Sequence, residues 1–178
     1  MGLRLRASLL AVCVGFCSAL PGGPARAQGG EVFEDPERNF SLSLPLGWQA
    51  VTNSDAAGRA VLDVIVYRVR ENGSLKIRRI TVEPKVETLA YAQQDEQTRL
   101  VFQPAYNKGA VEKFVGATPG ALVTYDFNSA SGRPMGGRNY YLRANESTIY
   151  LLTFTGSRNT LAPIRNQTDA IARSFRGK

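Results

Sequence analysis

The segment that most constrains the fold is an apolar run near the C-terminal end of the chain, STIYLLTFTG, at residues 147–156. Successive side chains of an extended chain point to opposite faces of a sheet. Both faces of this run are largely apolar, with Ile149, Leu151 and Thr153 on one and Tyr150, Leu152 and Phe154 on the other. The run therefore predicts an inner strand that is covered on both sides.

Two further patterns predict strands in the first half of the chain. The segment FSLSL, residues 40–44, alternates apolar and polar side chains and is followed by turn residues. The segments RAVLDVIVYRVR and SLKIRRITVE are joined through Asn72-Gly73, a dipeptide that suits a tight hairpin turn. A strict two-residue hairpin pairs Arg70 with Leu75 and Arg68 with Ile77.

Helices are predicted on both sides of a meander of strands. Residues 87–102 contain good helix formers and no glycine or proline, which predicts a helix of about three turns. The second half then predicts strands near residues 110–115, 121–128 and 137–144, with a mobile loop at 129–138. A closing helix, capped by Asn159 or Thr160, places five side chains on one face: Leu161, Ile164, Thr168, Ile171 and Phe175.

The N-terminus has the features of a secretory signal peptide. Two arginines precede a 14-residue apolar run, and Ala25-Arg26-Ala27 forms a small-x-small cleavage site. The run is shorter than the roughly 20 residues that span a bilayer, which favours cleavage over a retained anchor. Removing residues 1–27 from the chain of 178 leaves a single domain of 151 residues, residues 28–178, with no transmembrane segment. We therefore expect an exported protein, periplasmic or extracellular.

Composition removes several classes of function. The chain has no histidine, and both cysteines, Cys13 and Cys17, lie in the predicted signal peptide. Nucleophile systems that need cysteine or histidine, and most zinc or copper sites, are thereby excluded. Loss of three arginines with the signal lowers the formal net charge from +7 to +4, and the remaining basic residues are scattered, so nucleic-acid binding is not indicated. No cofactor is expected.

Carboxylates are the remaining source of catalytic or metal-binding chemistry. Glu34, Asp35 and Glu37 cluster near the start of the domain, and Asp95 and Glu96 lie on the first predicted helix. Paired acids act in glycoside hydrolysis, and calcium takes oxygen ligands. Neither group has the spacing of a calcium loop, and the ordinary interpretation is exposed surface acids.

The order of elements resembles the PsbP-like family. The resemblance rests on the entry FEDPERNFSLSLPLGW, the Asn-Gly hairpin, the hairpin YYLRANESTIYLLTFTGS and the terminal helix ending in ARSF, over roughly residues 31–176. It implies an α/β fold, an α/β/α sandwich with a central, mainly antiparallel sheet. It also implies a non-enzymatic accessory or assembly protein on the outer side of an energy-transducing membrane, which is the lumenal side in a photosynthetic cell. The metal sites of photosynthetic members use histidine, so no metal ligand is carried over.

Three hypotheses for the function follow. The first is an exported, monomeric accessory protein, not an enzyme, that binds a protein partner at a membrane surface. The alternatives are a carboxylate-based small-molecule hydrolase and a soluble carrier of an apolar ligand. The partner-binding residues predicted for the first hypothesis are hairpin bases and loop residues: Arg68, Arg70, Lys76, Arg78, Arg79, Arg133, Met135 and Arg138.

Overall fold

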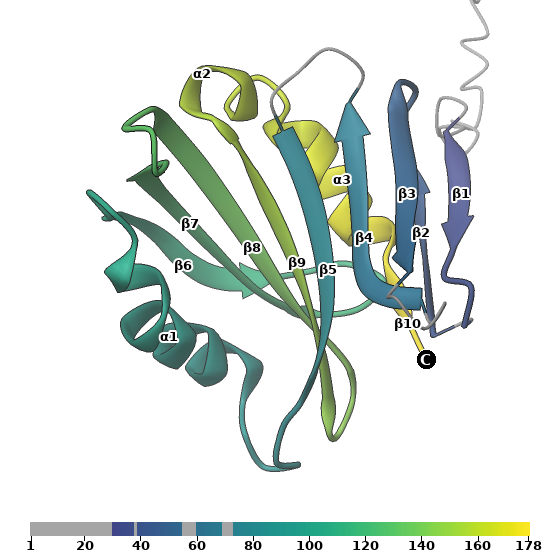
Figure 1. Ribbon diagram of the computed structural model, residues 1–178. Coiled ribbons are helices and arrows are strands. Elements are labelled where there is room, and N and C mark those ends of the chain that lie inside the picture. The colour runs from purple at the N-terminus through teal and green to yellow at the C-terminus, as the bar shows by residue number, and fades with distance from the viewer. Residues whose placement is uncertain (1–29, 38, 55–59, 69–72) are drawn as a thin grey trace, which may run out of the picture.

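A seven-stranded antiparallel sheet forms the centre of the molecule (Figure 1). The computed structural model describes residues 30–37, 39–54, 60–68 and 73–178. The strand order of the sheet is β3-β4-β5-β9-β8-β7-β6. Its strands are β3 (Trp48–Ser54), β4 (Ala60–Arg68), β5 (Gly73–Thr81), β6 (Asn107–Phe114), β7 (Gly120–Asn128), β8 (Pro134–Asn145) and β9 (Thr148–Ser157).

Helices cover both faces of this sheet. The helix α1 (Thr88–Thr98), followed by the short 3-10 turn η1 (Leu100–Phe102), packs on one face against β6, β7 and β8. The helices α2 (Arg158–Leu161) and α3 (Arg165–Ser174) lie on the opposite face. The α/β/α sandwich implied by the resemblance is therefore confirmed, and no helix in the described part of the chain is long and apolar enough to cross a membrane.

A second, three-stranded sheet closes the core next to α3. It consists of β1 (Glu31–Glu34), β2 (Phe40–Leu44) and β10 (Arg176–Gly177), in the order β1-β2-β10. The alternation predicted for β2 is present, because Phe40, Leu42 and Leu44 are buried while Ser43 is exposed.

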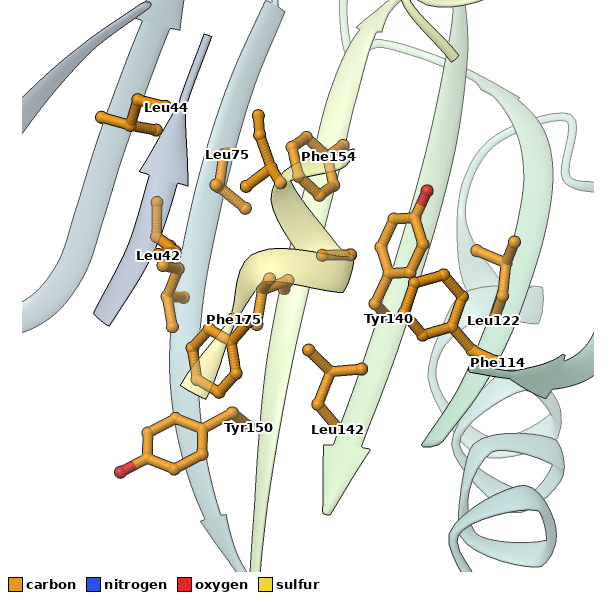
Figure 2. Close-up of a cluster of buried hydrophobic side chains, with 14 of the residues drawn as sticks. Leu42, Leu44, Leu75, Phe114, Leu122, Tyr140, Leu142, Tyr150, Phe154 and Phe175 are labelled. Carbon is orange, nitrogen blue, oxygen red and sulfur yellow. The ribbon is translucent and has the colours of Figure 1, made fainter. Parts of the chain in front are cut away.

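The strand β9 is the inner strand that its sequence predicts. It pairs with β5 on one side and β8 on the other, and both of its faces are buried. On the α3 face it joins a core of aromatic and aliphatic side chains (Figure 2). On the α1 face its Ile149 and Leu151 pack with a second cluster that contains Ala92 and Leu100. The protein thus buries two cores, one on each side of one sheet.

The predicted hairpin exists, but its predicted register is wrong. The strands β4 and β5 pair as Val66 with Leu75 and Tyr67 with Ser74, so β4 has slid by four residues from the strict hairpin. An even shift keeps each side chain on its predicted face, because side chains alternate with a period of two. Leu75 and Ile77 consequently still enter the core. Arg70 lies outside the described residues.

The predicted mobile loop at residues 129–138 is also wrong in part, because β8 begins at Pro134. Gly136 and Gly137 pair with β7 and β9 on their two sides. The ring of Tyr125 occupies the space over Gly137, where a Cβ atom would lie 2.2 Å from the ring carbon Cζ. Neighbouring side chains thus fill the space that glycine leaves, and the segment stays extended.

The closing helix is broken where its sequence predicts continuity. The structure has α2 and α3 on either side of Pro163, which has no N–H with which to continue the hydrogen-bond ladder. The N-caps are Ser157 and Ile164, not Asn159 or Thr160. The predicted inward face is nevertheless confirmed, because all five of its members are buried: Leu161, Ile164, Thr168, Ile171 and Phe175.

Candidate partner-binding site

Two of the five acids singled out in the sequence, Asp35 and Glu96, are buried, whereas Glu34 and Glu37 are exposed as expected. Asp35 is buried, and its carboxylate accepts hydrogen bonds from the backbone and side chain of Asn39. Glu96 is also buried, and it accepts hydrogen bonds from the Tyr106 hydroxyl and the Lys108 ammonium, both at 2.7 Å. These acids stabilise a turn and the contact between α1 and β6, so their expected exposure was wrong.

The pKa values of the α1 acids agree with a structural role. Burial acts to raise the pKa of Asp95, but hydrogen bonds from Arg99 and Tyr141 outweigh it, and the pKa lies below its usual range. Hydrogen bonds from Lys108 and Tyr106 lower the pKa of Glu96. Both groups therefore remain ionised, whereas a general acid needs a raised pKa.

A groove that contains several arginines lies on the α3 face, between the strands β6, β7 and β8 and the helices α2 and α3. Two adjoining hollows, of about 260 and 560 Å³, share Thr124, Arg138 and Arg165 as lining residues. Four arginines and three acids with side chains on this face line them. We call this surface the cationic groove: Arg138, Arg158, Arg165 and Arg173, with Glu112, Asp126 and Asp169.

Arg138 is held in place at the base of the cationic groove. Its guanidinium donates to the Asp169 carboxylate at 2.7 Å and to the Tyr140 hydroxyl at 2.9 and 3.1 Å, and only 11% of its side chain is exposed. The Tyr140 hydroxyl donates to Asp169 at 2.5 Å. Burial, together with this carboxylate, raises the pKa of Tyr140 to about 12, so the phenol keeps its proton at neutral pH.

Helix geometry places two further arginines of the groove on one face of α3. Arg165, Asp169 and Arg173 are spaced by four residues on α3, which puts them on one helical face. Asp126 and Arg158 form an ion pair at 3.2 Å. Two of the three groove acids are thereby neutralised within the groove, and among the described residues neither Arg165 nor Arg173 has an acidic partner within 4 Å.

The edge strand β6 borders the cationic groove. A bulge sets Gly109 and Ala110 opposite Thr124, whose hydroxyl accepts a hydrogen bond from the Ala110 N–H at 2.8 Å. A Cβ atom on Gly109 would lie 2.6 Å from the Thr124 carbonyl oxygen, so the bulge requires glycine at this position. Bulges at sheet edges hinder pairing with further strands, so we do not expect a partner to add a strand along β6.

The structure distributes the residues predicted from the sequence over several surfaces. Lys76, Arg78 and Met135 belong to the α1 face of the sheet, whereas Arg79 and Arg138 belong to the α3 face. Lys76, Arg78 and Arg79 are exposed, Arg133 is exposed in the loop before β8, and Met135 is half-buried in β8. Arg68 is the last residue of β4. They do not form one continuous site.

Three arginines of the cationic groove were not predicted from the sequence: Arg158, Arg165 and Arg173. The spacing of Arg165 and Arg173 by eight residues in the closing helix was the available signal. The opposite wall comes from strands many residues earlier in the chain, and no local pattern reveals that it lies nearby. Among the described residues, no cluster of three or more metal-binding side chains is present.

The two-sheet core and the helices on both faces define a PsbP-like α/β/α sandwich. Solved structures of the same fold include cyanobacterial PsbP from Synechocystis, with a TM-score of 0.54 and 12% identity over 90% of this chain and 100% of that one. The Ran-binding protein Mog1p of Saccharomyces cerevisiae matches with a TM-score of 0.57 and 9% identity, over 85% and 96% of the two chains. These low identities establish the fold alone.

A protein of Bacteroides thetaiotaomicron shares the fold over part of its length. It matches with a TM-score of 0.56 and 13% identity over 84% of this chain, which spans 48% of the Bacteroides chain. No protein-family model matches the sequence, and no curated protein is significantly similar to it.

Proposed function

We propose that this protein is an exported, non-enzymatic accessory or assembly protein that binds a protein partner at the outer face of a membrane. The observation that carries the proposal is the open cationic groove, in which Arg138 and Arg158 neutralise two of the three acids and leave net positive charge on the surface. Positive surfaces accelerate encounter with acidic partners. The predicted signal peptide supports export.

The hydrolase hypothesis receives less support. A glycoside hydrolase needs two carboxyl groups around one substrate, one of them with a raised pKa. The shifted carboxyl groups of the described residues, Asp95 and Glu96, both have a lowered pKa and are engaged by neighbouring side chains. Asp126 and Asp169 line the cationic groove but are paired with arginines.

The carrier hypothesis needs a dry cavity between the sheet and a helix. Between the seven-stranded sheet and the segment of α2 that leads to α3, the enclosed space lined by Trp48, Phe154, Leu161 and Ile164 measures about 10 Å³. That volume is about the size of one water molecule and does not hold an apolar ligand. Packing also occupies Trp48, whose indole N–H donates to Gln167 at 3.0 Å.

Export is expected to leave a mature protein that begins at Gln28. The apolar run is too short to anchor the chain, and Ala25-Arg26-Ala27 suits signal peptidase. The test is N-terminal sequencing of the protein purified from its own cells through a C-terminal tag. As a control, Ala27→Arg should block cleavage and leave the precursor. An uncleaved wild-type chain in the cytoplasm would refute export.

Partner binding is expected to depend on basic surface residues. Wild-type protein, tagged at its C-terminus, should retain a membrane complex from a detergent extract of its own cells. Two double variants with equal charge change locate the contact: Lys76→Glu with Arg78→Glu on the α1 face, and Arg165→Glu with Arg173→Glu in the cationic groove. Loss of the complex in either variant, with an unchanged melting temperature, supports the proposed function. Absence of any retained complex with wild type contradicts it.

A further inference from the structure

Two arginines on α3 determine the spacing of positive charge in the cationic groove. Arg165 and Arg173 are eight residues apart on one helical face, and the helix rise of 1.5 Å per residue separates them by about 12 Å. Both line the larger hollow of about 560 Å³, and Arg165 also lines the smaller one. The exposed positive charge is therefore spread along a line and does not converge on a point.

An extended peptide matches this spacing. Residues i and i+4 of an extended chain lie on the same side and about 13 Å apart, at roughly 3.3 Å per residue. Two carboxylates with that spacing can reach Arg165 and Arg173 together. A single phosphate is much smaller than this spacing, so it matches the pair of arginines less well than a peptide with two carboxylates does.

The walls of the groove are suited to hold such a peptide. Arg138, clamped by Tyr140 and Asp169, forms a rigid base between the two arginines. The Arg173 guanidinium lies 6.0 Å from the centre of the Phe114 ring, which orients it at the wall formed by β6. Because the bulge at Gly109 and Ala110 interrupts the regular edge of β6, recognition falls mainly to the side chains.

We propose that the cationic groove binds an extended acidic segment of a protein partner, two of whose carboxylates, four residues apart, pair with Arg165 and Arg173. This inference rests on the proposed function, because the segment belongs to the partner. It adds the location of the contact, the conformation of the bound segment and the spacing of its acidic residues.

The first test uses synthetic peptides and the full exported protein. A fluorescein-labelled decapeptide of alternating aspartate and serine should bind wild type at low ionic strength, as measured by fluorescence anisotropy. A decapeptide of alternating asparagine and serine should not bind. The double variant Arg165→Glu and Arg173→Glu should weaken binding by about tenfold or more, because tenfold corresponds to only 1.4 kcal/mol for two charge pairs together. Since exposed ion pairs are screened, 0.5 M salt should abolish binding.

The matched control is Lys76→Glu with Arg78→Glu, the same change of charge on the opposite face of the sheet. It should weaken peptide binding far less than the groove variant does, because Lys76 and Arg78 lie on the other face of the sheet and cannot contact a peptide in the groove. Equal weakening by both variants would overturn the inference, because binding would then depend on net charge alone. Thermal melts show whether each variant is folded. If the double groove variant does not fold, the single variants Arg165→Gln and Arg173→Gln replace it.

Two further experiments test whether the groove recognises a peptide or any anion. Displacement of the peptide by millimolar inorganic phosphate would show a simple anion site and overturn the inference. Binding of phosphatidylglycerol vesicles by wild type, with no binding of the aspartate peptide, would make the groove a lipid surface and also overturn it.

The capture experiment distinguishes failure of this inference from failure of the proposed function. A complex retained by the Arg165 and Arg173 variant but lost in the Lys76 and Arg78 variant supports the proposed function and refutes the groove as its site. Peptide binding that behaves as expected, together with no complex retained by wild type, supports the groove chemistry and refutes the proposed function.

Discussion

Replacing Phe154 with alanine is expected to lower the free energy of unfolding by about 3–5 kcal/mol, the usual cost of truncating a buried phenylalanine. Phe154 lies in the central strand β9 and is 1% exposed. Its ring meets Trp48 at 6.2 Å and Tyr140 at 5.5 Å between centroids, both edge-on. Figure 2 shows Phe154 and Tyr140 side by side in the core. Truncation removes both contacts at once and leaves a cavity that strands on either side cannot close.

The matched control for this substitution is Phe102→Ala, the same chemical change at a site that is 80% exposed. It should change stability by no more than about 0.5 kcal/mol. The measurement is chemical denaturation of the two variants beside wild type. For a domain of this size, the loss at Phe154 should also lower the melting temperature by roughly 10 °C. Similar small losses in both variants would contradict the position of β9 at the centre of the core.

Replacing Lys108 with alanine is expected to cost about 2 kcal/mol of stability at pH 7 and much less at pH 3. The Glu96 carboxylate is only 5% exposed and is paired with Lys108 at 2.7 Å. Removing the cation leaves a buried carboxylate with the Tyr106 hydroxyl as its remaining partner. Breaking such a pair typically costs 3–5 kcal/mol, and we expect less here because Lys108 is 54% exposed and its attraction is partly screened.

The pH dependence follows from the direction of the pKa shift. Hydrogen bonds from Lys108 and Tyr106 lower the pKa of Glu96, so the pair stabilises the wild type above the ordinary pKa of a glutamate. That contribution is lost as the pH falls through the lowered pKa of the folded state. In the variant, burial without the cation raises the pKa of Glu96, so protonation relieves the cost at low pH. The difference between wild type and variant should therefore shrink as the pH falls.

Lys113→Ala is the control for Lys108→Ala, because Lys113 lies on the same strand β6 and is exposed. Among the described residues it forms no ion pair with an acid, and its removal should leave stability within about 0.5 kcal/mol of wild type at both pH values. Denaturant unfolding of the three proteins at pH 7, 5 and 3 provides the measurement. A constant deficit for Lys108→Ala across this range would mean that Glu96 is not the group responsible.

The candidate site was only partly accessible to sequence reasoning. Arg138 was selected as a loop residue, but it is a strand residue whose guanidinium is bound by Asp169, 31 positions later. The eight-residue spacing of Arg165 and Arg173 is visible in the sequence, but no pattern near them indicates that β6 forms the facing wall. Glu96 was expected to be exposed, because its partner Lys108 comes from a different element. Each of these errors concerns a contact between segments that are distant in the chain.

Local sequence patterns were sufficient to predict the strands and helices themselves. The two apolar faces of β9, the alternation of β2 and the buried stripe from Leu161 to Phe175 depend on the direction in which successive side chains point, which the backbone geometry imposes on any such sequence. The tertiary structure alone decided the four-residue slide of β4, the extended path of Gly136 and Gly137, and the burial of Glu96. These features depend on which surfaces meet across the sheet, and packing between distant segments determines that choice.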